Sequence, residues 1–207
     1  MKITVQTKAG ERTFACDANE KLLFAGLRQG IELPYECATG TCGTCKARCV
    51  SGPVEPGWRE APGRSYLKEE RGEFLLCQDT AVGDCTIHVP GKTPVETGAL
   101  PRPVYHWGTL GAYTRLTPDV VSFTLAINPG MDFAPGQFVV CDVPGVEGGR
   151  AYSMVNCAPR ATVLEFVVKK KPGGKFSEWI FAADRDRTQV RVFGPLGRAV
   201  FRPEEDK

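Results

Sequence analysis

Four cysteines are spaced in a way that could hold a metal centre. Cys37, Cys42 and Cys45 form a C-x4-C-x2-C run, and Cys77 follows at a distance within a Leu-Leu-Cys-Gln segment. This is the spacing with which four thiolates bind a plant-type [2Fe–2S] cluster. The sequence therefore predicts a [2Fe–2S] cluster, a group that exchanges single electrons.

The residues between these cysteines suit a tight loop around a small anionic cluster. Gly40 and Gly43 allow the backbone to approach closely and to adopt positive φ. The small residues Thr41 and Thr44 leave their backbone N–H groups free to point at sulfur. Such donors offset part of the negative charge of a cluster and tune its reduction potential.

Other uses of the cysteines are less consistent with the spacing. Structural zinc usually takes two short C-x2–4-C units, and only Cys42 and Cys45 form a C-x2-C pair here. A Rieske centre needs two histidine ligands, and the only histidines, His88 and His106, lie near no matching cysteine motif. We therefore expect both histidines to be ordinary surface or packing residues.

Cys49 offers an alternative fourth ligand, since it follows Cys45 closely. The segment 46–50 alternates like a strand, however, and a strand would carry Cys49 away from the cluster. We expect a packing role for it. The remaining cysteines are expected to be small core residues: Cys16, Cys85, Cys141 and Cys157.

The first half of the chain shows the pattern of a small mixed α and β domain. The pattern predicts strands at 3–7, 11–16, 46–50 and 84–89, a helix that starts near 17–20 and ends near Gly30, and a helical turn at 65–71. Segment 90–103 then holds four prolines and two glycines. Such a composition is typical of a linker. We expect domains at 1–92 and 104–207, joined by a linker at 93–103.

The second half alternates short apolar segments with Pro and Gly turns. The pattern predicts one helix, at 175–183, and strands at 105–115, 119–126, 137–142, 150–156, 163–169 and 189–194. Many short strands with few helices favour a small barrel.

A second set of residues in this half could bind a dinucleotide. In a strand, Arg150 and Tyr152 point to one face, where Arg can pair with a pyrophosphate and Tyr can lie against a flat ring. Gly173 and Gly174 precede the predicted helix, whose N-terminus would present free N–H groups, and Ser177 adds a hydroxyl. The combination suits a flavin dinucleotide.

Both halves resemble known families. Residues 1–90 resemble the plant-type ferredoxin domain, an α+β β-grasp fold, and the surroundings of Cys77 look like those of bacterial oxygenase reductases. The second half resembles the FAD-binding domain of the ferredoxin–NADP reductase superfamily, an antiparallel Greek-key β-barrel. In this order, the two domains resemble the reductase components of multicomponent oxygenases, such as benzoate dioxygenase or toluene and phenol monooxygenase reductases.

The resemblance implies roles for individual residues. Arg150 would bind phosphate, Tyr152 would pack on the isoalloxazine, and Ser153 would hydrogen-bond near flavin N5. Gly174, Lys175 and Ser177 would hold the pyrophosphate region. The full set of implied FAD-binding residues comprises Arg150, Ala151, Tyr152, Ser153, Val168, Lys170, Gly173, Gly174, Lys175 and Ser177.

The resemblance also implies a function for a longer parent protein. Such reductases take a hydride from NAD(P)H onto FAD and pass single electrons through the cluster to a Rieske-type or diiron oxygenase. The family continues into a nicotinamide-binding domain, whereas this sequence ends soon after the barrel and has no G-x-G-x-x-G motif. We therefore expect a truncated chain that retains the FAD and cluster half and reacts poorly with NAD(P)H. The alternative is a ferredoxin-type carrier with a flavin-free docking barrel.

Composition and charge indicate which other classes of partner are to be expected. The net charge is +2, from 26 basic and 24 acidic residues, which gives no reason to expect nucleic acid or an anionic membrane as a partner. No apolar stretch approaches the roughly 18 residues of a membrane span, and the N-terminus lacks the apolar segment of a signal peptide. We expect a cytoplasmic protein.

Overall fold

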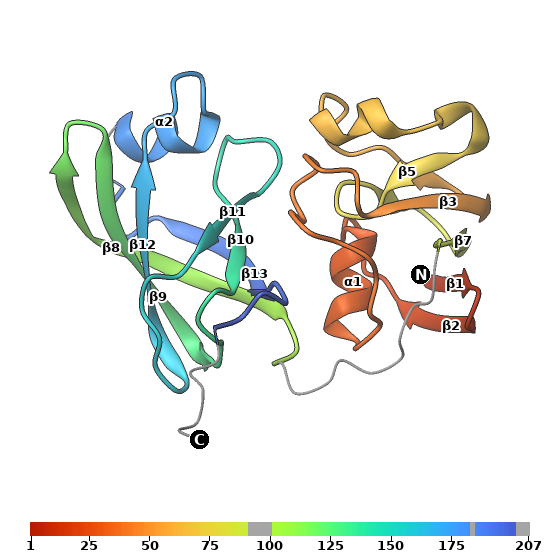
Figure 1. Cartoon of the computed structure of the whole chain (residues 1–207), viewed down its shortest axis with the longest axis horizontal. Coiled ribbons are helices and arrows are strands. Elements are labelled where there is room, and N and C mark those ends of the chain that lie inside the picture. Colours follow the sequence, from red (N-terminus) through yellow and green to blue (C-terminus); the bar gives the residue numbers. More distant parts are fainter. Residues whose placement is uncertain (91–100, 183–184, 202–207) are drawn as a thin grey trace. The chain divides into compact units, whose positions relative to one another are not determined.

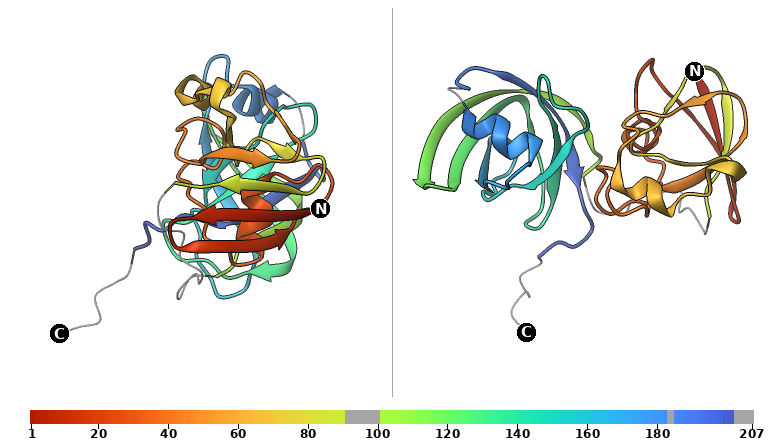
Figure 2. Two further views of the ribbon diagram at one scale, coloured as in Figure 1. Left: turned by 90° about the vertical axis from the view of Figure 1, so that its right-hand side faces the viewer. Right: turned by 90° about the horizontal axis from the view of Figure 1, so that it is seen from above.

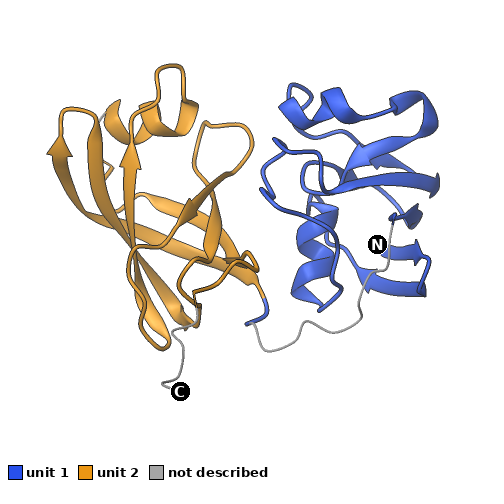
Figure 3. Ribbon diagram, viewed as in Figure 1, with its two compact units in different colours: residues 1–102 blue, residues 103–207 orange. Residues whose placement is uncertain are grey.

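The computed structural model describes residues 1–90, 101–182 and 185–201 (Figure 1). The chain forms two compact units, residues 1–102 and 103–207 (Figure 3). Most of the predicted linker at 93–103 lies outside the described residues. The exact domain limits stay a prediction.

The first unit is a mixed sheet with one helix packed on it, as in a β-grasp fold. Its main sheet has the order β2-β1-β7-β3-β5, in which β1 and β7 are parallel and the other neighbours are antiparallel. The elements are β1 (Lys2–Thr7), β2 (Gly10–Ala15), α1 (Leu22–Arg28), β3 (Lys46–Ser51), β4 (Val54–Glu55), β5 (Glu73–Leu75), β6 (Thr80–Ala81), β7 (Cys85–His88) and two 3-10 turns, Pro62–Tyr66 and Glu69–Arg71.

Helix α1 is held by burial rather than by a side-chain cap. All of its residues except Arg28 are buried. The predicted helix start within 17–20 is wrong, because Lys21 is the N-cap residue and makes no side-chain capping bond. The Glu20 carboxylate instead accepts the Asp17 backbone N–H at 3.1 Å and pairs with Arg28 at 2.7 Å. The ion pair joins the residue before the N-cap to the last residue of the helix.

The second unit is a curved six-stranded antiparallel sheet with the order β11-β10-β13-β8-β9-β12, a Greek-key barrel whose curvature is clear from above (Figure 2). Its edges meet where the Val155 N–H donates to the Glu165 carbonyl at 2.9 Å. The elements are β8 (Val104–Thr117), β9 (Val120–Met131), β10 (Phe138–Asp142), β11 (Arg150–Ser153), β12 (Ala161–Lys169), α2 (Lys175–Ala182) and β13 (Gln189–Leu196).

The cysteines outside the predicted cluster mostly behave as expected. Cys16, Cys85 and Cys141 are buried, and burial raises the pKa of the Cys16 and Cys85 thiols to about 11. Cys157 is exposed, so its predicted core role is wrong. Cys49 lies in β3, where its Sγ faces the Gly52 carbonyl at 3.2 Å, and so has a partner of its own.

Candidate functional site

The loop that carries three of the predicted ligands depends on residues in the left-handed backbone region. Ala38, Gly40 and Gly43 have φ of 55°, 81° and 75°. A Cβ on Gly40 would lie 2.9 Å from Gln78 Cγ, and one on Gly43 would lie 2.9 Å from Tyr66 Cδ2. The two glycines therefore serve both the turn and the close approach of neighbouring segments.

Backbone N–H groups converge on the first cysteine. The N–H groups of Thr39, Thr41 and Cys42 lie 3.5, 3.4 and 3.4 Å from Cys37 Sγ. Burial by itself would raise the pKa of Cys37, but the hydrogen bonds from these groups outweigh it and lower the pKa. The loop is thus arranged to stabilise a thiolate, which is the form that binds metal. The Thr44 hydroxyl donates to Glu36 at 3.3 Å.

The four predicted ligands lie in two pairs. The Cys42 side chain helps to lower the pKa of Cys37, and Cys45 Sγ lies 3.2 Å from Cys77 Sγ. All four cysteines are free thiols. The hydrogen bond from Cys45 lowers the pKa of Cys77 and raises that of Cys45, so one thiolate is favoured in this pair. No group of three or more His, Cys, Asp or Glu side chains among the described residues could hold a single metal ion. Two thiol pairs suit a cluster of two irons better than one ion.

Gln78 is a neighbour of the cluster ligands that sequence reasoning did not assign. Its Nε2 donates to Cys77 Sγ at 3.5 Å. Its Oε1 is buried and has no hydrogen-bond partner among the described atoms. A side-chain donor on a ligand sulfur is the kind of contact that tunes a cluster's potential.

A buried ion pair behind Cys77 was also missed. Asp79, 1% exposed, pairs with Arg64 and accepts the backbone N–H groups of Gly57 and Leu75 at 3.1 and 3.0 Å. Arg64 also donates to the Trp58 carbonyl at 2.9 Å. The pair therefore ties the segment that carries Cys77 to the loop at 57–64. The signal in the sequence was only a charged residue beside an apolar run, which is common.

The loop at 57–64 in turn supports the cluster loop. The Gly63 N–H donates to the Gly40 carbonyl at 2.7 Å. A Cβ on Gly63 would lie 2.8 Å from that same oxygen, so only glycine fits without movement. The cluster loop thus rests on a second loop that Asp79 holds in place.

In the second unit, Arg150 and Tyr152 lie on one face of edge strand β11. Both are half-buried, whereas Ala151 and Ser153 between and after them are exposed. Arg150 Nη1 donates to the carbonyls of Gly148 and Gly149 at 2.9 and 3.0 Å. Burial raises the pKa of Tyr152 to about 12, so its phenol is neutral at physiological pH.

The N-terminus of α2 lies beside Tyr152, whose ring centroid is 4.5 Å from that of Phe176. The structure thereby brings together the strand and the helix from which the sequence predicts a flavin site. Among the described residues, the backbone N–H groups of Lys175, Phe176 and Ser177 have no hydrogen-bond partner. Three free donors at a helix N-terminus suit an anion.

The other predicted flavin residues have local roles. The Ser177 hydroxyl lies 3.0 Å from the Lys171 N–H and is engaged within the turn. Gly173 has φ of 71°, and its N–H donates to Glu178 at 2.8 Å. A Cβ on Gly174 would lie 2.6 Å from Ser177 Oγ. These residues shape the turn that presents the free donors.

Val168 and Lys170 occupy β12 and its end. Val168 is 3% exposed and belongs to the hydrophobic core of the barrel. Lys170 Nζ lies 5.7 Å from the ring centroid of Phe181, near the end of α2. The structure gives neither residue a contact with Arg150 or Tyr152 among the described interactions.

Comparisons with known proteins agree with the domain families predicted for the two halves of the chain. Residues 3–81 match the 2Fe-2S iron-sulfur cluster binding domain, and residues 108–201 match the oxidoreductase FAD-binding domain. The chain is 35% identical over 195 residues to the ferredoxin–NAD(+) reductase component of the alkene monooxygenase system of Xanthobacter autotrophicus, which covers 93% of this chain and 58% of the relative. It is 36% identical over 200 residues to the ferredoxin–NAD(P)(+) reductase CarAd of Metapseudomonas resinovorans. This match covers 94% of this chain and 59% of that relative.

The chain is homologous to the ferredoxin–NAD(P)+ reductase components of oxygenase systems. The solved ferredoxin reductase of carbazole 1,9a-dioxygenase has the same fold, with a TM-score of 0.85 and 32% identity over 99% of this chain and 64% of that chain. The chain thus spans less than two thirds of the length of these relatives.

The residues of this reductase homologue fit the two cofactors that its domain families bind, a [2Fe–2S] cluster and FAD. Two thiol pairs with convergent N–H donors fit the cluster, and a cation, a neutral aromatic ring and three free helix N–H groups fit a flavin dinucleotide. Within the described residues, no helix is long and apolar enough to cross a membrane.

Proposed function

We propose that this protein belongs to the reductase component of a multicomponent oxygenase, in which electrons from NAD(P)H-reduced FAD pass through the [2Fe–2S] cluster to the oxygenase. The observation that carries the proposal is the presence of both sites in one chain, four thiols in two pairs in the first unit and the β11–α2 site in the second. When bound, flavin supplies two-electron chemistry and the cluster supplies one-electron transfer.

The geometry of each unit supports the following residue roles. Cys37, Cys42, Cys45 and Cys77 would hold the cluster, and their thiols lie as two neighbouring pairs, Cys37 with Cys42 and Cys45 with Cys77. The N–H groups around Cys37 would stabilise the anionic cluster.

In the second unit, Tyr152 would lie against the isoalloxazine, and Arg150 would turn from the carbonyls of 148–149 to the pyrophosphate. The free N–H groups at 175–177 would bind the same group. Ser153, Val168 and Lys170 remain candidates by resemblance alone.

The acceptor is proposed to be a Rieske-type or diiron oxygenase component. Two relatives support an oxygenase as the acceptor, since one is the reductase component of a naphthalene 1,2-dioxygenase system and another that of a propane 2-monooxygenase. The alternative, an electron carrier with a flavin-free barrel, is less consistent with the match of residues 108–201 to an FAD-binding domain.

The test is anaerobic photoreduction of the purified chain, followed by rapid mixing with a panel of purified oxygenase components. We expect flavin and cluster absorbance to bleach on reduction, and the cluster to be reoxidised within seconds by at least one oxygenase. A purified chain without flavin would favour the carrier alternative. A reduced cluster that reoxidises at the same rate with and without every oxygenase would refute the proposal.

A further inference from the structure

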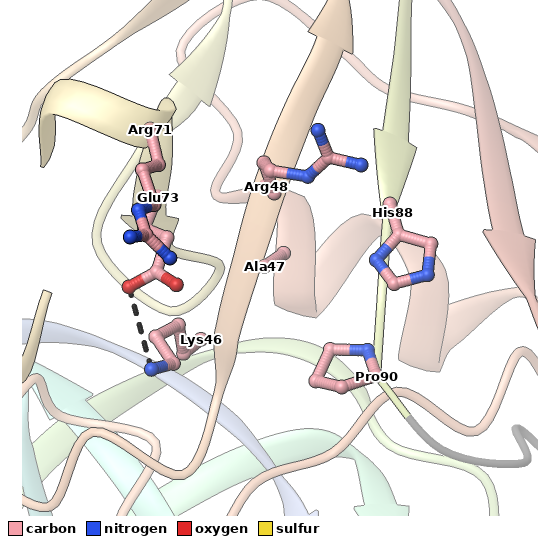
Figure 4. A pocket seen from close by; sticks show the side chains of 7 residues that line it. All are labelled: Lys46, Ala47, Arg48, Arg71, Glu73, His88 and Pro90. Carbon is pink, nitrogen blue, oxygen red and sulfur yellow. Dashed lines mark ion pairs between the residues drawn. The ribbon is translucent and has the colours of Figure 1, made fainter. Parts of the chain in front are cut away.

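A basic cleft lies on the open face of the sheet in the first unit (Figure 4). Its volume is about 680 Å³, and its lining includes Lys46, Arg48, Arg71, Glu73, His88 and Pro90. Three of these side chains are cations and one is a carboxylate. None of these residues is a predicted cluster ligand or a predicted flavin-binding residue.

The pairing of three strands places the charges together. Arg48 on β3 lies opposite Glu73 on β5 and His88 on β7. Phe74, one position away from Glu73, is buried, and so is Ala47, which also lines the cleft. Because side chains alternate along a strand, Arg48, Glu73 and His88 share the open face, as Figure 4 shows.

The single carboxylate neutralises only part of this charge. Glu73 pairs with Lys46 at 3.3 Å. Arg48 forms no ion pair with any carboxylate in the described part of the chain. Arg71 lies 3.9 Å from its neighbour Glu70, and both side chains are about two thirds exposed, so this pair is weak. The cleft therefore has two cations available for an external anion.

The next strand adds no acid that could occupy the cleft. Gln6 on β1 lies opposite His88 on the other side, and its Nε2 donates to Glu11 at 2.7 Å. Glu11 lies on β2, the edge strand of the sheet, and is held there by this bond to Gln6 on β1. The cations of the cleft are therefore separated from Glu11, which lies at the other edge of the same sheet.

We propose that this cleft is the docking site for an acidic, carboxylate-rich segment of the protein that accepts electrons from the cluster. The identity of that protein rests on the proposed function. Arginine binds carboxylates through its fork of N–H donors. Lys46 directly follows Cys45, so a segment in the cleft would lie beside a predicted cluster ligand. Opposite charge on two partners also accelerates their encounter.

A labelled twelve-residue polyglutamate peptide serves as the probe, titrated into the full chain with its cofactors and followed by fluorescence anisotropy at low salt. We expect saturable binding that weakens about fivefold in Arg48→Gln, since one exposed charge contact is lost. Glu73→Gln should tighten binding by a similar factor, and its amide oxygen can still accept the Lys68 N–H that Glu73 accepts at 2.8 Å. Arg12→Gln is the matched control, because exposed Arg12 lies opposite buried Val5 and so off the open face.

Three results of this titration would overturn the inference. One is the absence of saturable binding, and another is an equal loss in Arg48→Gln and Arg12→Gln, which would mean that only net charge matters. The third is displacement of the peptide by inorganic pyrophosphate at lower concentration than by unlabelled peptide, which would indicate a phosphate site.

The oxygenase that reoxidises the cluster in the preceding test provides a second measurement. We expect its second-order reoxidation rate to fall about fivefold in Arg48→Gln and to stay unchanged in Arg12→Gln. Equal rates in both variants would overturn the docking site while leaving the proposed function intact. If no oxygenase reacts, the proposed function fails, and the peptide titration alone decides whether the cleft binds acidic segments.

Discussion

Replacing Asp79 with Asn should destabilise the first unit and loosen its cluster. The Asp79 side chain is 1% exposed and the Arg64 side chain 11%, so the substitution leaves a buried cation without its partner. The Asn side chain also offers one acceptor atom where the carboxylate accepts the N–H groups of Gly57 and Leu75 as well. Removing one partner of a buried ion pair typically costs about 3–5 kcal/mol. We expect a loss of unfolding free energy of that size.

The assay must separate the two units, because a chain with two compact units need not unfold in one step. Visible circular dichroism of the cluster reports the first unit during urea unfolding, and flavin fluorescence reports the second. We expect the cluster signal of Asp79→Asn to disappear at lower urea while the flavin signal is unchanged. Asp17→Asn is the control, since Asp17 is 81% exposed and its pair with Arg28 should contribute about 1 kcal/mol or less. A loss below about 1 kcal/mol in Asp79→Asn, or an equal loss in both signals, would refute the reasoning.

Three further predictions concern the cofactor sites. Cys77→Ser should abolish the [2Fe–2S] spectrum and the bound iron. Cys49→Ser should keep both, because the Cys49 thiol faces the Gly52 carbonyl. An intact spectrum in Cys77→Ser would exclude Cys77 as a ligand. Arg150→Ala should weaken FAD binding roughly ten- to hundredfold in titrations of the apoprotein, with Arg12→Ala as control, and an unchanged affinity would place the pyrophosphate elsewhere. The raised pKa of Tyr152, about 12 against the ordinary 10.0, means that its stabilising effect is complete below pH 10 and is lost as the pH rises towards 12. Tyr152→Phe should therefore flatten the fall in urea stability between pH 9 and 11, and parallel curves for both proteins would contradict this.

The sequence by itself determined the chemistry of the first unit. Three of the predicted ligands lie within one short segment, Cys37 to Cys45, and only Cys77 is distant in the chain. Their spacing predicted the cluster that the matched domain family binds. The positive φ of Gly40 and Gly43 was also predictable, because only glycine adopts that region without cost. Alternation at 46–50 correctly predicted the strand that contains Cys49, since period two is a local property of the chain.

Tertiary structure alone decided which residues meet. The Cys45 and Cys77 sulfurs lie 3.2 Å apart although 32 positions separate them in the chain, and Asp79 binds Arg64 across 15 positions. Local patterns also misplaced the start of α1, because burial of its apolar residues outweighed the capping preference of 17–20. Cys157 was wrongly predicted to be buried for the same reason, since the exposure of a small residue depends on which segments pack over it. Contacts between distant segments depend on the packing of the whole unit, and no short stretch of sequence contains that information.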